Sequence, residues 1–502
     1  MKTLFMAVAL QLAAMCMVWA QKPVLNIPFE FEKKRLASSD YDAYFLQSGT
    51  GTTFSLLLKD NEKTEYLLID QNFKIVSKVD VDLKETVFDK GNNEYSGGTD
   101  RNNAFRYIYK KKLPSTRISY LFQTETVDFT TKTVNQAKLF EIPSEQKIIT
   151  SFSDNNNFYT LTSDDDAKQL IVYSVNEAGE PKTNRIPFNV PSTAGKKRDK
   201  LSEYLSQLEV IKAGEEPDMS ASVSFAKLFS TKGSLNFVIN EEGHPTHLFR
   251  LSLPNFTAEE KFFDPGKTKE GSGEKLKVNS FLQGDRLFSM VLGRKDVSIV
   301  VQDAADQHTI SQYTINEETS PAFFARSPVN DRRMGKSLSS KDVNKFRSLI
   351  NVLDGGTKGI MVTPNKNGQL IVTVGTYDPI MLPGGGGYEG GYQRGPNYNN
   401  SPSPNMVYNP YLHYRPGFST YMGDRARYYN TTYFKLLMDP SASKVEKGPV
   451  PTPVAEQIKD YLQGTDRKAK ATNQFSMGQQ QYYGYYDKDA KQYQVEEIKL
   501  QK

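Results

Sequence analysis

The chain has 502 residues, of which 38% are hydrophobic and 24% charged, enough for a large buried core or for roughly two or three ordinary domains. Its formal net charge is only +5, and the basic residues fall in short clusters such as 110–112, 196–198 and 332–333. A charge this small and dispersed is typical of solvated loops and not of a phosphate-binding stripe, so we expect no nucleic-acid partner.

The first twenty residues have the features of a cleaved leader. Lys2 precedes an apolar run, and small residues close the run just before Gln21, as a signal peptidase requires. The run is shorter than the ~20 residues that a membrane-spanning helix needs. We therefore predict a signal peptide over 1–20, export of residues 21–502, and no transmembrane segment after cleavage.

The only cysteine, Cys16, and the only tryptophan, Trp19, both lie in this leader. A secreted eukaryotic chain of this length usually carries disulfides, so their absence favours a bacterial protein. The predicted location is the periplasm, the outer surface or the extracellular medium of a Gram-negative-type bacterium. A mature chain without cysteine also excludes thiolate catalysis and cysteine-ligated metal sites.

The segment 157–175 predicts a β-hairpin. Its two strands, 158–162 and 169–175, are rich in β-branched and aromatic residues and are separated by a polar turn. Apolar side chains occupy both faces of the returning strand, as expected of a sheet packed between other sheets. Similar units recur at intervals of roughly 50 residues, beginning near Phe54, Phe105, Leu235 and Leu287. A fixed period of this length indicates a repeat architecture.

Two helices are predicted between the strands. Apolar residues recur at helical spacing between Leu201 and Leu208, which predicts a helical insert over 193–213. A second helix is predicted over 340–353, with Ser340 as its N-cap and a Gly-Gly pair after it as its stop.

The composition changes abruptly at 383–418, where Gly, Pro, Asn and Tyr dominate and Glu389 is the only acid. A segment of this composition cannot build a core. Its tyrosines offer large amphipathic contact areas with little side-chain entropy to lose. The predicted binding residues are Tyr388, Tyr392, Tyr398, Tyr408, Tyr411 and Tyr414. The alternative is a lengthened surface loop without a binding role.

These elements together predict an all-β, β-propeller-like fold over residues 21–502, with about seven blades. An isolated strand at 24–31 is expected to complete the blade begun by a hairpin at 482–500, which closes the ring and removes its edges. The alternative is a series of tandem β-sandwich domains, which also contain many short strands. The repeats lack the Trp-bearing signatures of common propellers, so they indicate no specific family.

Residues suited to catalysis or metal binding are few. His244 and His247 stand at a strand entrance, but no glutamate lies between them as a base, and a hairpin turn with two exposed imidazoles is favoured. Asp164, Asp165 and Asp166 lack the alternating spacing of a calcium loop and indicate a solvated turn.

Scattered carboxylates offer one route to catalysis, as an acid and a base acting on a glycan at the centre of the ring. They are Asp42, Glu85, Asp128 and Asp285. Spacing along the chain does not show that they converge. We therefore predict no catalytic residue, no metal site and no cofactor.

The predicted function is that of an exported, non-catalytic binding or scaffolding protein of a bacterial cell envelope. Its expected partner is a protein or a glycan, contacted partly through the insert 383–418. One alternative is an extracellular carbohydrate-active enzyme with a carboxylate-lined central pocket. Another is an adhesive or structural surface protein that displays the insert.

Overall fold

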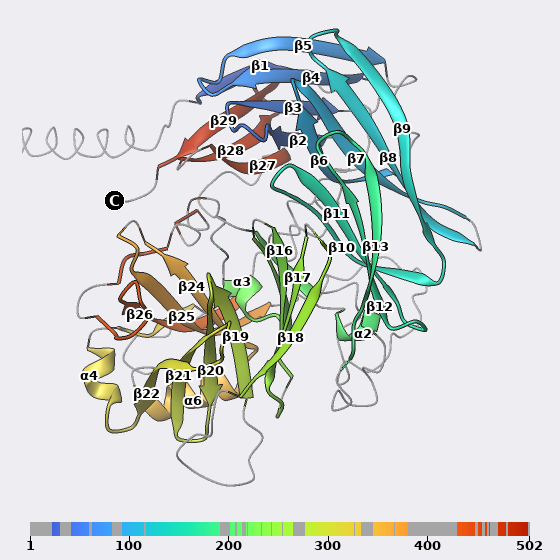
Figure 1. Ribbon diagram of the computed structural model, residues 1–502. Coiled ribbons are helices and arrows are strands. Elements are labelled where there is room, and N and C mark those ends of the chain that lie inside the picture. Colours follow the sequence, from blue (N-terminus) through green and yellow to red (C-terminus); the bar gives the residue numbers. More distant parts are fainter. Residues whose placement is uncertain are drawn as a thin grey trace, which may run out of the picture.

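Antiparallel strands joined by tight turns make up most of the described chain in the computed structural model (Figure 1). Asparagine pairs shape some of these turns: Asn102 and Asn103, and again Asn155 and Asn156, have positive φ. Two successive residues with positive φ form a turn whose twist matches that of the flanking strands. Asn adopts positive φ more readily than most residues. The structure describes residues 23–30, 42–59, 63–82, 93–114, 117–190, 201–205, 208–212, 217, 219–231, 233–241, 243–253, 255–264, 277–325, 327–332, 345–365, 367–379, 429–446, 450–453, 457–458, 461, 470–477 and 480–499.

The described strands form seven sheets, which makes the chain all-β in class. The first sheet contains β2 (Asp42–Gln47), β3 (Thr53–Lys59), β4 (Lys63–Asp70) and β5 (Ile75–Asp82). The second contains β6 (Asn93–Arg101), β7 (Ala104–Lys112), β8 (Ile118–Asp128) and β9 (Thr133–Pro143). The third contains β10 (Gln146–Asp154), β11 (Asn157–Asp164), β12 (Gln169–Val175) and β13 (Pro181–Pro187).

In the first three sheets the strands pair in chain order, but in the later sheets not all strands do. The fourth contains β14 (Leu208–Lys212), β15 (Ala226–Thr231), β16 (Ser234–Ile239), β17 (Thr246–Ser252) and β18 (Ala258–Phe263). The fifth contains β19 (Lys277–Gln283), β20 (Arg286–Leu292), β21 (Asp296–Asp303) and β22 (Thr309–Asn316). The sixth contains β24 (Lys358–Pro364), β25 (Leu370–Pro379), β26 (Tyr429–Met438) and β23 (Asn330–Arg332). The seventh contains β27 (Lys470–Met477), β28 (Gln480–Asp487), β29 (Gln492–Ile498) and β1 (Leu25–Pro28).

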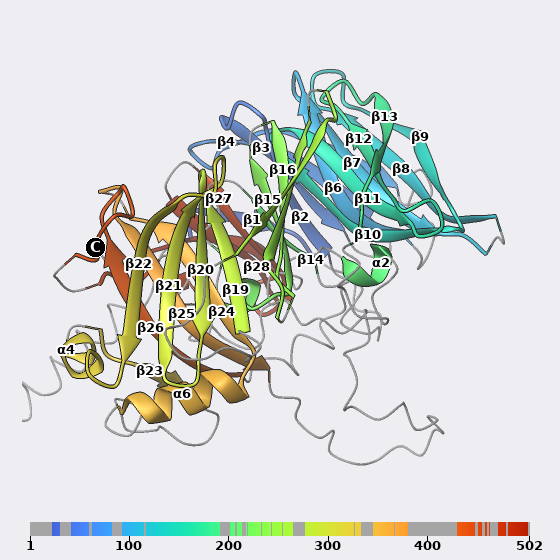
Figure 2. The ribbon, with the colours of Figure 1, turned by 60° about the horizontal axis from the view of Figure 1, so that its bottom comes forward.

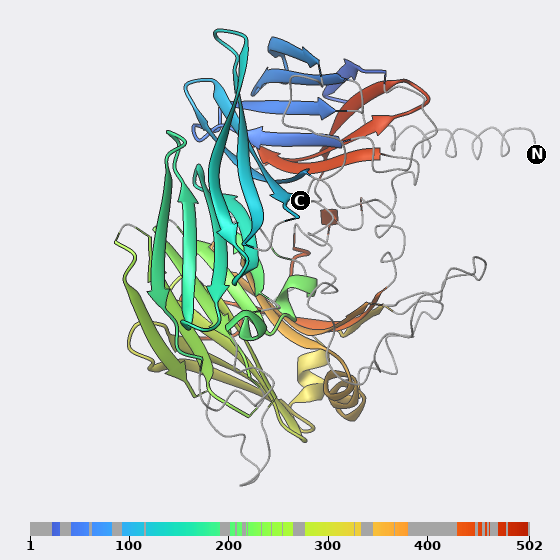
Figure 3. The same cartoon turned by 90° about the vertical axis from the view of Figure 1, so that its right-hand side faces the viewer.

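The strand nearest the N-terminus completes the sheet formed by the C-terminal strands. β1 pairs antiparallel with β29, with Leu25 opposite Val495 and Ile27 opposite Tyr493. Figure 3 shows the blue N-terminal and red C-terminal strands beside each other. This is the pairing between 24–31 and 482–500 that the sequence analysis predicts.

Apolar cores lie between neighbouring sheets, because both faces of the middle strands carry apolar side chains. Phe54, Phe105 and Phe158, one from the second strand of each of the first three sheets, are almost completely buried. Separate clusters join the seventh sheet to the first, the first to the second, the second to the third and the third to the fourth. One larger cluster joins the fourth, fifth and sixth. Among the described residues, no such cluster joins the sixth sheet to the seventh.

The segment 193–213 is not the helical insert that its apolar spacing predicts. Of its described residues, only those of α2 (Leu201–Tyr204) are helical, whereas β14 is a strand that pairs in parallel with β15. The prediction was wrong for 208–212 because pairing with a later strand, which is a tertiary contact, overrides local helical spacing. A further short helix, α3 (Met219–Ser222), follows β14 and lies against Gly359 of β24, where an added Cβ would come within 2.7 Å of the Ser222 carbonyl oxygen.

The second predicted helix corresponds to α6 (Phe346–Gly355), which ends where the Gly-Gly pair begins and has Gly356 at its C-cap. Figure 2 shows α6 at one end of the sixth sheet, and α4 (Ser320–Phe324) lies nearby. The helix does not begin at the predicted N-cap Ser340, because its N-cap is Lys345, which has an extended backbone. Ser340 itself, the leader 1–20 and the insert 383–418 lie outside the described residues. No helix in the part of the chain described here is long and apolar enough to cross a membrane.

Candidate functional site

The six tyrosines predicted to bind a partner fall in the segment 380–428, outside the described residues. They are Tyr388, Tyr392, Tyr398, Tyr408, Tyr411 and Tyr414. The described residues contain a second group of tyrosines, which lies on the seventh sheet.

β28 carries four tyrosines, and the alternation of side chains along a strand divides them between two faces. Tyr482 and Tyr486 belong to the core shared with the first sheet, so Tyr483 and Tyr485 lie on the opposite face. The rings of Tyr483 and Tyr485 stack with centroids 5.5 Å apart, and Tyr461 meets Tyr483 edge-on at 6.3 Å. We call Tyr461, Tyr483 and Tyr485 the tyrosine face.

The carboxylate of Glu496 in β29 joins two members of the tyrosine face. The Tyr461 hydroxyl donates to its Oε2 at 2.6 Å, and the Tyr485 hydroxyl donates to its Oε1 at 2.8 Å. Burial, followed by these bonds to the carboxylate, raises the pKa of both hydroxyls well above the ordinary value. Both hydroxyls therefore keep their protons and remain donors at neutral pH.

Glu496 has no ion-pair partner among the described residues, although its carboxylate is only partly buried. Other aromatic rings among the described residues do have cations over them, and each of those cations is a lysine. The pairs are Lys63 over Phe29, Lys110 over Tyr120, Lys182 over Phe256 and Lys435 over Tyr433. Tyr483 is buried with Ile458 and Ile498, whereas Tyr461 and Tyr485 are partly buried. The tyrosine face thus combines two partly buried rings with a carboxylate that the described chain does not neutralise.

A buried lysine links three strands of successive sheets. Lys227 of β15 is fully buried, and its Nζ donates to the Ser224 carbonyl at 2.9 Å and to Asn279 Oδ1 at 3.0 Å. Asn279 of β19 also accepts from the backbone N–H of Ile360 in β24 at 3.4 Å. Burial lowers the pKa of Lys227 to about 7, against the opposing influence of Glu209. These contacts give Lys227 a structural role in joining the fourth, fifth and sixth sheets.

The carboxylates considered for a central acid–base pair have separate surroundings. Asp128 accepts from the N–H groups of Thr130 and Thr131 in its own turn. Asp285 is exposed, 3.7 Å from the Arg250 guanidinium. Asp42 lies in β2, on the first sheet. Glu85 lies outside the described residues.

The hairpin expected to expose two imidazoles buries one of them. His247 stacks on Phe262 at 4.7 Å, and its Nδ1 lies 3.3 Å from the Tyr204 hydroxyl. Its Nε2 is 3.6 Å from Glu260, and burial lowers the pKa of His247 to about 4. His247 is therefore a core histidine, and the expectation of an exposed ring was wrong. Sequence reasoning missed this because the covering residues come from α2 and β18.

The aspartates of the turn after β11 also have partners within the fold. Asp165 accepts from the backbone N–H of Ser202 at 2.8 Å and from its hydroxyl at 2.6 Å, which holds α2 against the third sheet. Asp164 accepts from the N–H of Ala167 at 2.9 Å. These contacts account for two of the three carboxylates in a turn.

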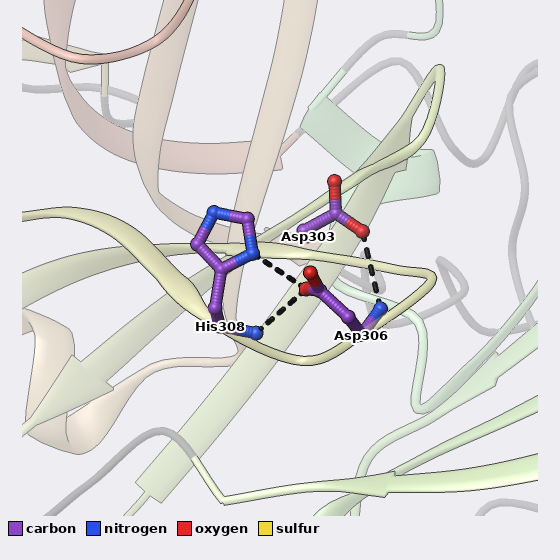
Figure 4. Close-up of side chains that lie close together, drawn as sticks. All are labelled: Asp303, Asp306 and His308. Carbon is purple, nitrogen blue, oxygen red and sulfur yellow. Dashed lines mark hydrogen bonds and ion pairs between the residues drawn. The ribbon is translucent and has the colours of Figure 1, made fainter.

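Asp303, Asp306 and His308 come together in the turn between β21 and β22, with potential ligand atoms within 4.8 Å of one another (Figure 4). Asp303 accepts from the N–H of Ala305 at 2.7 Å, and Asp306 accepts from His308 Nδ1 at 2.5 Å. The Lys261 ammonium also donates to the Ala305 carbonyl at 2.7 Å, which places a positive charge beside the turn. These hydrogen bonds stabilise the turn.

The tyrosine face was not predicted, although part of its signal is visible in the sequence. Alternation within 480–487 separates Tyr483 and Tyr485 from Tyr482 and Tyr486 once the strand is recognised. No local pattern points to Tyr461, which lies 35 positions from the carboxylate that it contacts.

No protein-family model matches the chain, and no curated protein matches it. Among solved structures, it is similar to one of two prolyl endopeptidases at 9% identity, over 89% of this chain and 46% of the other, with a TM-score of 0.32. It is similar to prolyl oligopeptidase B from Galerina marginata at 8% identity, over 69% of this chain and 42% of the other, with a TM-score of 0.27. It is also similar to the β-propeller domain of the Trilobed protease from Pyrococcus furiosus at 8% identity, over 66% of this chain and 79% of the other, with a TM-score of 0.27. The chain spans less than half the length of the first two, and likenesses this weak carry no argument about its activity.

Proposed function

We propose that this chain is an exported, non-catalytic binding or scaffolding protein of a bacterial cell envelope. Its fold is proposed to be a seven-bladed β-propeller, closed where β1 joins the C-terminal strands. Two features support this fold: the seven sheets, and the pairing of the two chain ends in one sheet, which leaves fewer unpaired edges.

The observation that carries the binding role is the tyrosine face with Glu496. Tyrosine is favoured at binding surfaces because its large, stiff ring loses little entropy when a partner immobilises it. Glu496 holds the hydroxyls of Tyr461 and Tyr485 in place, which preorganises both rings before a partner arrives. The proposed partner is a protein or a glycan of the envelope, and the tyrosines of 383–418 are proposed to add contacts to it.

Co-sedimentation of the mature chain, residues 21–502, with purified envelope material tests this proposal. The materials are peptidoglycan sacculi and outer-membrane vesicles, compared with chains that lack 383–418 or that carry Tyr461→Leu and Tyr485→Leu together. We expect the mature chain to sediment, and both variants to sediment less while still unfolding in one cooperative thermal transition. A Tyr159→Leu chain is the control, because Tyr159 is buried between the third and fourth sheets.

Equal sedimentation of all folded variants would contradict the binding role of both tyrosine surfaces. Export has its own test, which is the N-terminal residue of the protein recovered outside the bacterial cytoplasm. The proposal requires that this residue be Gln21.

A further inference from the structure

We propose, building on the binding role above, that Glu496 and the tyrosine face receive a lysine ammonium group from a partner polypeptide. The partner is therefore expected to present a basic segment to the face of the seventh sheet that lies opposite the core shared with the first sheet. The geometry that points to this ligand is one carboxylate held by two tyrosine hydroxyls, beside stacked rings.

The first step concerns the rings. A cation is attracted to the negative face of an aromatic ring when it lies within about 6 Å of the centroid. Tyr461 stands at 79° to Tyr483, and Tyr485 lies nearly parallel to Tyr483 at 25°. Tyr483 is 6% exposed and packs with Ile458 and Ile498, so a ligand cation would have to reach the partly buried rings of Tyr461 and Tyr485. Aromatic rings grouped around one point are the arrangement that recognises ammonium groups.

The second step concerns charge. Both oxygens of Glu496 accept hydrogen bonds from neutral hydroxyls, so these bonds leave its negative charge in place. No described lysine or arginine neutralises it, whereas Glu65, Glu94 and Glu259 all have lysine partners. A partly buried carboxylate without a cation favours a positively charged ligand over a neutral or acidic one.

The third step concerns the identity of the cation that the partner presents. Every cation over a ring that the structure describes in this chain belongs to lysine. The ammonium of lysine is a compact charge on a flexible stem, and its methylene groups can lie along tyrosine rings. A neutral glycan would use the same rings but would gain nothing from the charge of Glu496.

Isothermal titration of the mature chain with a blocked hexalysine peptide tests the inference. We expect saturable binding that weakens as salt is raised, and roughly tenfold weaker binding by Glu496→Gln because one charge-assisted contact is lost. Glu497→Gln is the matched control: it removes the same charge from the next residue of β29, whose side chain points to the other face. Its affinity should stay within roughly twofold of the parent chain.

Two tyrosine variants provide an independent test should Glu496→Gln fail to fold. Tyr485→Phe keeps the ring and loses the hydroxyl with its contacts to Glu496 and Gln494, whereas Tyr485→Leu loses the ring as well. We expect Tyr485→Leu to weaken hexalysine binding more than Tyr485→Phe does, because the attraction between cation and ring requires the aromatic face. Equal, unchanged affinities for these two variants would overturn the inference.

Three further ligands separate failure of this inference from failure of the proposed function. Binding of hexaglutamate as tight as that of hexalysine overturns the inference, and so does binding of tetramethylammonium without binding of hexalysine. Binding of chitohexaose that Tyr485→Leu abolishes and Glu496→Gln leaves unchanged also overturns it, but preserves a binding role for the tyrosine face. If no ligand binds and the leucine variants still sediment with envelope material, both the inference and the proposed role of this face are contradicted.

Discussion

Asn473 of β27 donates a hydrogen bond from its side-chain Nδ2 to the carbonyl oxygen of Ala43 in β2, at 2.6 Å, across 430 positions of the chain. At the same boundary, the rings of Phe45 and Phe475 stack at 4.0 Å. The seventh sheet is therefore fastened to the first by side chains as well as by the pairing of β1 with β29. The two ends of the chain form one packed unit.

Replacing Ile27 by alanine tests this unit. Ile27 is 3% exposed in the core between the seventh and first sheets, so Ile27→Ala is expected to cost about 2–5 kcal/mol through lost burial and a residual cavity. Asn26→Ala is the control, because Asn26 is exposed on the other face of the same strand. Urea unfolding followed by circular dichroism measures both. Equal midpoints for the two variants would show that β1 does not contribute to the stability of the fold.

Gly375→Ala should destabilise the sixth sheet. An added Cβ there would lie 2.3 Å from the Thr432 carbonyl oxygen in the neighbouring strand, so the backbone of β26 would have to shift. Gly355→Ala places the same methyl group at the end of α6, where nothing lies within 4 Å of the new atom. We expect a lower thermal midpoint for Gly375→Ala and an unchanged or slightly higher one for Gly355→Ala, since alanine favours a helix by up to about 1 kcal/mol. The opposite order of midpoints would contradict the packing of β25 against β26.

Lys227 should make stability depend on pH above neutrality. The unfolded chain keeps this lysine protonated up to its ordinary pKa of 10.5, whereas burial lowers the folded pKa to about 7. Between these values the unfolded state binds more protons, so the free energy of unfolding rises with pH, by at most about 1.4 kcal/mol per unit. Urea midpoints at pH 6.5, 8 and 9.5 should therefore rise for the parent chain.

Lys227→Met isolates this contribution, because it keeps most of the side-chain volume and removes the titrating group. We expect the difference in stability between the parent chain and Lys227→Met to change over this pH range. Lys138→Met, at an exposed position of β9, should show no such change. Parallel pH curves for the parent chain and Lys227→Met would contradict a lowered pKa for Lys227.

The strands could be predicted where the information is local. The hairpin of β11 and β12 has apolar strands around an Asp-rich turn, and Asn pairs at turns such as Asn102–Asn103 supply the positive φ that tight hairpins need. The partner of 24–31 was also predictable, because an unpaired edge strand at one end of a repeat requires a partner at the other. The hairpins and turns depend on a few neighbouring residues, whereas the pairing of β1 with β29 follows from the repeat as a whole.

The remaining features depend on contacts between distant segments. β14 was predicted as part of a helix because its strand conformation comes from parallel pairing with β15. His247 was expected to be exposed because the sequence around it does not reveal that Tyr204 and Phe262 cover its ring. Glu496 could not be recognised as part of a site because Tyr461 reaches it from a separate segment. The tyrosines of 383–418 remain a prediction.

The most direct test of the central claim is fluorine NMR of the mature chain labelled with 3-fluorotyrosine. Phenylalanine substitutions assign the resonances of Tyr461 and Tyr485, and the fully buried Tyr66 and Tyr107 serve as internal references. If the tyrosine face binds a partner through a lysine, titration with hexalysine will shift the Tyr461 and Tyr485 resonances saturably and leave the references in place. Unchanged resonances at both positions, or equal shifts at all four, would contradict the assignment of this face as the binding site.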